Sequence, residues 1–327
     1  MSVCFFCVKP ELQTGIINRV ASAIHDHRHP SYVKDQIVQL STQRIFQIVA
    51  GYEDTNDSYT LKHDPILILA CESDDHLASQ PTMCRFENAP DRKTLYRIGA
   101  ALVDSFIASY QSPPESIILD LGDTDDPTHG SQQLTLFNAY HDCYCSMPLH
   151  IYEGKSGKLI TTILLPCKSP AGKEIVSILK RIVKKIRQAW PELGILIRGD
   201  SYYRAPAVYD FCDHQDIKYI LGFKPYKPLL QDAGNLMTQA RELSEHSDIP
   251  IKIYGELSYQ AKSWPKAKRI ICKAEYNDKG ALSLRLGQQA FEHLHCLAKF
   301  FPVALLESLL GLVHLRLRLN QLPLLAG

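Results

Sequence analysis

The first 112 residues contain three stretches in which apolar side chains recur every three or four positions. These stretches run from Leu12 to Ile24, from Ile37 to Val49 and from Asp91 to Tyr110. This spacing places the apolar side chains on one face of a helix. A long segment rich in Asp, Asn, Gly and Pro, which favour turns, separates the second stretch from the third. The pattern predicts a helical N-terminal region over residues 1–112.

From Pro113 onward, short apolar runs alternate with polar turns, and longer amphipathic segments interrupt them. Short apolar runs bounded by turn residues indicate strands. The predicted strands are residues 116–121, 134–137, 143–152, 159–165, 194–198, 217–223, 250–259 and 268–276, and the predicted helices are residues 171–190, 205–214 and 228–247. This order of strands and helices predicts a mixed α/β fold.

The segment from Ala171 to Trp190 predicts a strongly amphipathic helix, which Pro191 ends. Its polar face is basic and consists of Lys180, Arg181, Lys184, Lys185 and Arg187. Two interpretations of this face remain open. It is either a surface that contacts phosphates or the ordinary solvated side of a helix.

The net charge of +1 hides an uneven distribution of charge. Residues 1–150 hold 10 Lys and Arg against 19 Asp and Glu, whereas residues 151–280 hold 22 against 14. A basic segment of this kind indicates contact with a polyanion such as nucleic acid, or attraction between the two parts of the chain. With 45% hydrophobic and 22% charged residues, a mostly disordered chain is excluded.

No segment indicates export or insertion into a membrane. The first ten residues lack the basic and apolar regions of a signal peptide. The longest apolar run, Phe300 to Val313, is too short to span a bilayer and contains Glu307. The ten cysteines do not have the spacing of a disulfide framework. We therefore expect a cytoplasmic protein with reduced thiols and no membrane contact.

Aspartates end two of the predicted strands. Asp120 ends the first of them and Asp123 follows closely, in the segment LDLGDTDDP, while Asp200 follows the strand 194–198. Crowded carboxylates repel one another unless a cation neutralises them, and Mg²⁺ prefers oxygen ligands. Two such ions can stabilise the attacking and leaving oxygens of a phosphoryl transfer. The pattern indicates either a metal site or an acidic turn, because Asp and Pro also favour turns.

Several long blocks of the chain resemble the DDE-type transposases of bacterial insertion sequences, in the same order. The blocks are GYEDTNDSYTLKHDP (51–65), LASQPTMCRFEN (77–88), IILDLGDTDDPTHGSQQ (117–133), FNAYHDCYCSMPLHIYEG (137–154), AWPELGILIRGDSYYRAPAVYDFCD (189–213), YILGF (219–223) and YGELSYQAKSWPKAKRIICKAEY (254–276). The resemblance covers about residues 11–280. It implies an RNase H-like mixed sheet with flanking helices, preceded by the helical N-terminal region.

The resemblance also implies a reaction. Members of this family cut DNA at transposon ends and join the ends to a target, using two divalent ions (Mg²⁺ or Mn²⁺) held by an Asp-Asp-Glu triad. Asp200 matches the second aspartate of the triad, and the first falls at Asp120, with Asp123 as a neighbour. The family pattern Asp-x-Asp-x-Thr-Asp has an aspartate where this chain has Gly122. If that aspartate is the metal ligand, its loss would abolish catalysis.

After residue 280 the resemblance stops. The last 47 residues include 16 leucines, and their only acidic residues are Glu292 and Glu307. Neither lies in the Tyr, Arg, Glu and Lys motif that carries the family's glutamate, so a truncated or frameshifted copy is expected. The predicted divisions are a helical region (1–112) that is a candidate for DNA binding, an RNase H-like core (113–280) with a β-containing insertion from about residue 225, and a divergent tail (281–327).

The family's partner is DNA, at the terminal inverted repeats of the element. The residues predicted to contact phosphates are Lys180, Arg181, Lys184, Lys185, Lys266, Lys268 and Arg269. Tyr202, Tyr203 and Trp264 are expected either to stack on bases or to pack in the protein. An active copy is expected to form a homo-oligomer. Three hypotheses remain: a transposase, a non-catalytic remnant that binds the transposon ends, and a product without function.

Overall fold

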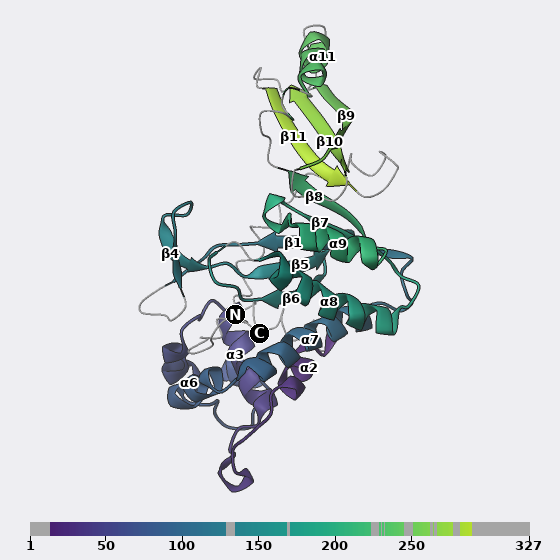
Figure 1. The fold of residues 1–327 in the computed structure, drawn as a ribbon. Coiled ribbons are helices and arrows are strands. Elements are labelled where there is room, and N and C mark those ends of the chain that lie inside the picture. The colour runs from purple at the N-terminus through teal and green to yellow at the C-terminus, as the bar shows by residue number, and fades with distance from the viewer. Residues whose placement is uncertain are drawn as a thin grey trace.

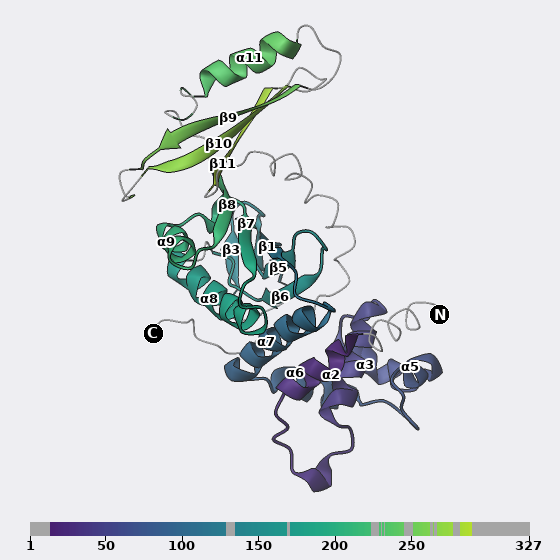
Figure 2. The same cartoon turned by 90° about the vertical axis from the view of Figure 1, so that its right-hand side faces the viewer.

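The computed structural model describes residues 14–128, 135–168, 171–223, 229, 231, 233–244, 251–261, 264 and 267–276, together with the backbone of residues 282–289. Figures 1 and 2 show three parts that follow one another along the molecule. A group of helices from the N-terminal region lies at one end, a sheet with its helices lies in the middle, and a smaller group of strands with one helix lies at the other end.

The N-terminal region is helical, as the apolar spacing predicts. Its longer helices are α2 (Ile16–Ala23), α3 (Ile37–Val49) and α7 (Arg92–Ala108), which confirm the three predicted stretches. The turn-rich segment between α3 and α7 also forms helices, α4 (Ser58–Leu61), α5 (Pro65–Ala70) and α6 (Gln80–Asn88). These helices are too short to show a periodic pattern, although Asp64 caps α5 by accepting hydrogen bonds from the N–H groups of Ile66 and Leu67.

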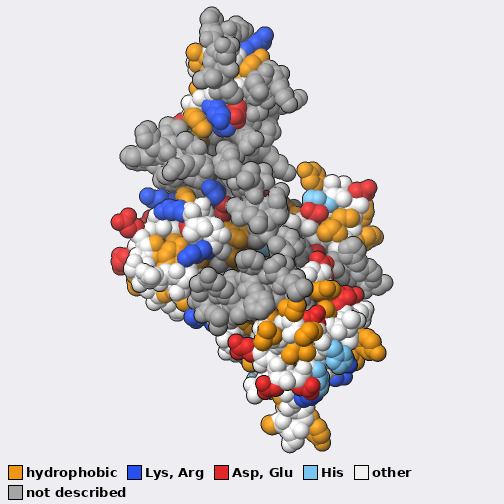
Figure 3. All heavy atoms as spheres, turned by 180° about the vertical axis from the view of Figure 1, so that it is seen from behind, with side chains coloured by type: hydrophobic (Ala, Val, Ile, Leu, Met, Phe, Trp, Pro, Cys, Tyr) orange, Lys and Arg blue, Asp and Glu red, His pale blue; other side chains and the backbone are white. Residues whose placement is uncertain are grey.

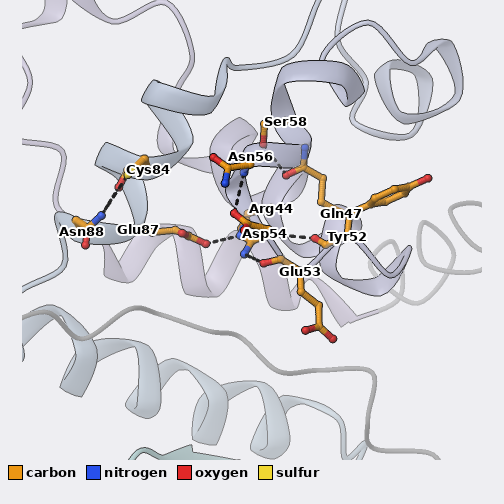
Figure 4. A network of polar contacts seen from close by, with 10 residues as sticks. All are labelled: Arg44, Gln47, Tyr52, Glu53, Asp54, Asn56, Ser58, Cys84, Glu87 and Asn88. Atoms are coloured by element: carbon orange, nitrogen blue, oxygen red, sulfur yellow. Dashed lines mark hydrogen bonds and ion pairs between the residues drawn. The ribbon is translucent and has the colours of Figure 1, made fainter. Parts of the chain in front are cut away.

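A buried ion pair joins α3 to α6 (Figure 4). Arg44 of α3 pairs with Glu87 of α6, and each of these side chains is only 5% exposed. The guanidinium group of Arg44 also donates hydrogen bonds to the carbonyl groups of Tyr52 (3.2 Å) and Glu53 (2.6 Å). Arg44 therefore holds the turn after α3 against both helices.

The main sheet contains eight strands, and its central part is formed by five of them, in the order β6-β5-β1-β7-β8. Their bounds are β1 (Ser116–Asp123), β5 (Leu149–Glu153), β6 (Leu159–Ile163), β7 (Gly194–Gly199) and β8 (Lys218–Phe223). β5 is antiparallel to both β1 and β6, whereas β7 is parallel to both β1 and β8. This mixed sheet of five strands with flanking helices confirms the predicted RNase H-like fold class.

Two helices cover one face of the central sheet (Figure 2), namely α8 (Gly172–Ala189) and α9 (Pro206–His214). The buried residues of β1 alternate at Ile117, Leu119 and Leu121, and they pack in one core with the apolar face of α8. α7 contributes Val103 and Phe106 to the same core. The helical region and the sheet therefore share a hydrophobic core.

The predicted strand 143–152 is interrupted. Residues Cys143–Ser146 form β4, which pairs with β2 (Asp126–Pro127) and β3 (Leu136–Asn138) in a separate sheet, and only the residues from Leu149 onward join the central sheet as β5. Pro148 lies between the two strands. A proline has no N–H group for a strand ladder, which explains why the pairing changes there.

Beyond β8, three more strands continue the sheet. They are β9 (Ile251–Tyr259), β10 (Lys268–Tyr276) and β11 (Leu282–Gln289), and α11 (Gly234–Ser244) packs against them (Figure 1). The order β8-β11-β10-β9 places β11 between β8 and β10. The strand 282–289 thus lies in the segment that the sequence assigned to the divergent tail. The division of the chain into three domains stays a prediction.

No helix in the described ranges has the length and apolar character needed to cross a membrane.

Candidate functional site

Two acidic residues of the candidate site lie at the ends of two neighbouring strands. β1 and β7 are parallel and paired, with Leu121 opposite Gly199, so their carboxyl ends reach the same edge of the sheet. Asp123 is the last residue of β1, and Asp200 directly follows β7. Ligand sites of α/β sheets form at this kind of edge.

Asp200 begins a short 3₁₀ helix, Ser201–Tyr203. Its Oδ1 atom accepts a hydrogen bond of 2.7 Å from the N–H group of Tyr202. Gly222 of β8 packs against the backbone of Asp200, because a Cβ atom at position 222 would lie 2.8 Å from the nitrogen of Ser201. Only glycine fits there without a shift of the Asp200 turn. The sequence pattern did not single out Gly222.

Tyr203 connects the two strand ends. Its side chain is buried, with 1% of its surface exposed, and its hydroxyl group donates a hydrogen bond of 2.8 Å to Oδ1 of Asp123. Burial, together with the negative charges of Asp123 and Asp200, raises the pKa of the Tyr203 hydroxyl far above its usual range. The phenol therefore remains a donor, and both carboxylates lie near it. Tyr203 is a packing residue that positions Asp123.

Asp120 has a different environment. It lies opposite Arg198 in the register of β1 and β7, and both of its carboxylate oxygens accept hydrogen bonds from the Arg198 guanidinium group, with a distance of 2.8 Å between Nε and Oδ1. The two side chains are 20% and 19% exposed. Since side chains alternate along a strand, Asp120 and Asp123 project from opposite faces of β1. The structure does not bring these two carboxylates together.

Gly122, where the family pattern has an aspartate, has free space around it. A Cβ atom added at this position would meet no other atom within 4 Å, and the backbone is not in the left-handed region. Gly122 lies on the same face of β1 as Asp120, one position beyond the Leu121–Gly199 pair. The backbone therefore has room for a side chain at the position where this chain lacks one.

The donor chemistry agrees with a divalent cation only in part. Asp123 and Asp200 supply hard oxygen atoms at the ends of two paired strands, and the charges of both act on the Tyr203 hydroxyl. Mg²⁺ is commonly held by one or two carboxylates plus substrate phosphates. Asp120 fits less well, because Arg198 already neutralises it. In the described part of the chain, no three or more His, Cys, Asp or Glu side chains form a group that could hold a metal ion. Glu292 and Glu307 lie outside the described residues.

The basic residues of α8 differ in their availability for DNA. Lys180 and Lys184 are exposed. Arg181 lies over the ring of Tyr96 at 5.2 Å, and Lys185 pairs with Asp104 at 2.8 Å. Two of the four predicted phosphate contacts on α8 thus have partners within the protein.

The predicted contacts beyond β8 are also largely engaged. Lys268 is 10% exposed, pairs with Asp213 at 2.8 Å and donates to the Tyr219 hydroxyl at 3.0 Å. Arg269 forms an ion pair with Glu256, with 2.9 Å between Nε and Oε2. Lys266 lies outside the described residues. On the face shown in Figure 3, the described Lys and Arg side chains lie among acidic and apolar ones and form no continuous basic patch.

The aromatic residues that were expected to stack or to pack have partners inside the protein. Trp264 contacts the rings of Tyr209, Phe223 and Tyr259 in edge-to-face geometry, with ring centroids 5.7 to 5.9 Å apart. The hydroxyl group of Tyr202 donates to the carbonyl of Lys168 at 2.6 Å. These contacts favour the packing interpretation.

The order of the sheet and the acidic residues at the ends of two parallel strands are features that the resemblance to DDE-type transposases implies. The family described as Transposase DDE domain group 1 matches residues 7–286, and the chain belongs to this family. No curated protein matches the chain.

Two solved structures resemble the chain at low sequence identity. One is the piggyBac transposase synaptic complex with hairpin DNA, with 10% identity, a TM-score of 0.42, and coverage of 90% of this chain and 62% of that chain. The other is the prototype foamy virus protease-reverse transcriptase, with 9% identity, a TM-score of 0.22, and coverage of 80% and 35%. This chain therefore spans less than two thirds of either protein.

Proposed function

We propose that this chain acts in DNA transposition, that it binds the terminal inverted repeats of a transposable element, and that Asp123 and Asp200 belong to a metal site for DNA cleavage and strand transfer. The observation that carries the proposal is the parallel pairing of β1 with β7, which brings the two strand ends to one edge of the sheet in a member of a transposase family.

Within this proposal, Asp123 and Asp200 hold the divalent cation, and the protein fixes the orientation of both. The Tyr203 hydroxyl orients Asp123, and the N–H group of Tyr202 orients Asp200. When bound, Mg²⁺ or Mn²⁺ would stabilise negative charge on the phosphate and on the attacking and leaving oxygens. Carboxylates that are already oriented need little rearrangement when substrate binds.

Lys180 and Lys184 are the exposed side chains best suited to phosphates. Because each neutralised phosphate releases counterions, binding that depends on them should weaken as salt increases. An active form would be a homo-oligomer that holds two transposon ends.

The test is a nicking assay on a DNA duplex that carries the element's own terminal repeat, with Mg²⁺ or Mn²⁺. Nicking should be lost in Asp200→Ala and strongly reduced in Asp123→Ala, since both remove metal-binding oxygens. Asp125→Ala, in the same acidic loop, is the matched control and should keep activity. Nicking by Asp200→Ala at the rate of the unaltered chain would contradict the proposal.

A second candidate function is a non-catalytic protein that binds transposon ends. The ion pair between Asp120 and Arg198 favours it, because it removes one predicted ligand, and Gly122 removes the carboxylate that the family pattern places beside it. In this case the repeat DNA would be bound with a steep dependence on salt, and no divalent ion would produce cleavage. Cleavage with either metal would exclude this alternative.

A further inference from the structure

A cluster of sulfur atoms lies at β4, in the three-stranded sheet β2-β4-β3, outside the candidate site. Cys145 of β4 is completely buried, and its Sγ atom lies 2.8 Å from Sγ of Cys167. The half-buried Cys143 contacts Cys145, and Met147 packs in the same cluster. All three thiols are free. The family resemblance assigns no role to them.

The backbone register places Cys145 and Cys167 directly opposite each other. Ser146 and Pro166 form an antiparallel bridge, and the N–H group of Met147 donates to the carbonyl of Leu165 at 2.9 Å. In this register, the residue before Ser146 faces the residue after Pro166. Opposed residues of antiparallel strands have Cα atoms about 4.5–5.5 Å apart. This range lies within the separation of about 4.4–6.8 Å that a disulfide requires.

We propose that Cys145 and Cys167 form a site of oxidative modification, at which a peroxide converts the two thiols into a disulfide. One thiolate attacks hydrogen peroxide, breaks its O–O bond and becomes a sulfenic acid, with release of hydroxide. The second thiol then attacks that sulfur and releases water. The two sulfurs together lose two electrons, and the peroxide oxygens accept them as water and hydroxide.

The environment indicates which thiol reacts first. Burial, followed by contacts with Cys167 and Cys143, raises the pKa of Cys145 to about 12. Burial therefore favours the protonated thiol at Cys145, which is completely buried, whereas Cys167 is 6% exposed and is the sulfur that peroxide can reach first. Cys145 acts as the second, resolving sulfur. Cys167 forms the sulfenic acid, and the Asn138 side-chain amide donates a hydrogen bond to it at 2.9 Å.

The disulfide would join β4 to the segment that follows β6. That segment includes Lys168, whose carbonyl group accepts the hydrogen bond from Tyr202, two residues after Asp200. The disulfide would therefore fix the backbone at Lys168, which supports one side of the turn at Asp200. The proposal depends only on the thiols, so it can fail or succeed whether or not the chain cleaves DNA.

The experiment uses the full chain, treated with hydrogen peroxide, alkylated and digested without reduction. Mass spectrometry should find the tryptic peptide that ends at Lys155 joined to the peptide 159–168. Because the first peptide holds both Cys143 and Cys145, the cross-link should persist in Cys143→Ser and disappear in Cys145→Ala and in Cys167→Ala. Cys212→Ala, which alters another fully buried cysteine, is the control and should keep the link.

A second measurement does not depend on the variants. Closing this loop should raise the Tm of the unaltered chain by about 5–10 °C over the reduced form, and dithiothreitol should reverse the change. Three results would overturn the proposal: alkylation of both thiols after peroxide treatment, a link between Cys145 and Cys143 instead, or irreversible oxidation of Cys167 with no link.

Discussion

Replacing Arg198 by methionine should destabilise the protein, because it leaves the Asp120 carboxylate without its two donors. Met keeps much of the apolar volume of Arg, so the change isolates the charge. A hydrogen bond to a charged group contributes about 1.5–3 kcal/mol, and breaking a fully buried ion pair costs about 3–5 kcal/mol. Since Asp120 and Arg198 remain 20% and 19% exposed, the expected loss is smaller, about 2–4 kcal/mol.

The assay is urea unfolding followed by tryptophan fluorescence, since Trp190 packs in the main core. The four proteins are the unaltered chain, Arg198→Met, Asp120→Leu and the double variant. The double variant removes both charges together, so it should be more stable than either single variant, with a coupling energy of about 1.5–3 kcal/mol. Each variant should lose the same free energy of unfolding with and without Mg²⁺.

A coupling energy below about 0.5 kcal/mol would refute the ion pair as the main role of Asp120. A second result would also refute it. If Mg²⁺ stabilises the unaltered chain but does not stabilise Asp120→Leu, Asp120 is a metal ligand.

Four further predictions follow from other parts of the structure. Gly122→Asp should fold with a change in Tm of less than about 3 °C, because the added side chain meets open space, and isothermal titration should show tighter Mn²⁺ binding than in Gly122→Asn. Arg44→Met should lower the free energy of unfolding by about 3–5 kcal/mol, since it removes the cationic partner of the buried Glu87; a loss below about 1 kcal/mol in urea titrations would contradict this. Burial alone would raise the pKa of Glu153, but hydrogen bonds from its neighbours lower the pKa overall. The ionised side chain therefore stabilises the folded protein above about pH 4.3, the usual pKa of Glu in an unfolded chain, and this stabilisation is lost as the pH falls below that value. Glu153→Gln should therefore be about 1–3 kcal/mol less stable at pH 7, and the gap should narrow by pH 3 in thermal scans. Lys184→Glu should weaken binding to repeat DNA and reduce its salt slope by about 1 in filter binding, whereas Lys185→Glu, already engaged with Asp104, should mainly lower Tm.

The local patterns of the sequence predicted much of the fold. The apolar face of residues 171–190 became the buried face of α8, and the alternation in residues 116–121 became the core side of β1. Each of these elements has a periodicity that depends only on nearby residues. The helices α4 to α6 were missed because four to nine residues are too few to display a helical period.

The candidate site could be predicted only in part, because its geometry depends on pairing between distant strands. The prediction that Asp120 ends a strand was wrong, because β1 continues to Asp123. The register with β7 sets Asp120 opposite Arg198, and the alternation of side chains along β1 puts it on the other face from Asp123. Lys268 is similar, since its burial beside Asp213 depends on where β10 meets α9. The sequence patterns singled out neither Gly222 nor the hydrogen bond of Tyr203 with Asp123. Both residues lie in blocks that resemble the transposase family, Gly222 in 219–223 and Tyr203 in 189–213.

The position of β11 has a consequence for the timing of folding. The ribosome synthesises β11 after β8, β9 and β10, yet β11 lies between β8 and β10 in the sheet. In the described sheet, β8 and β10 are joined only through their pairing with β11. During synthesis the outer edge of β8 must stay unpaired until residues 282–289 have been added. An open strand edge is a site for incorrect pairing and aggregation, and contacts between distant residues form slowly. A nascent chain that stalls before residue 282 would carry this exposed edge beside the Asp200 turn.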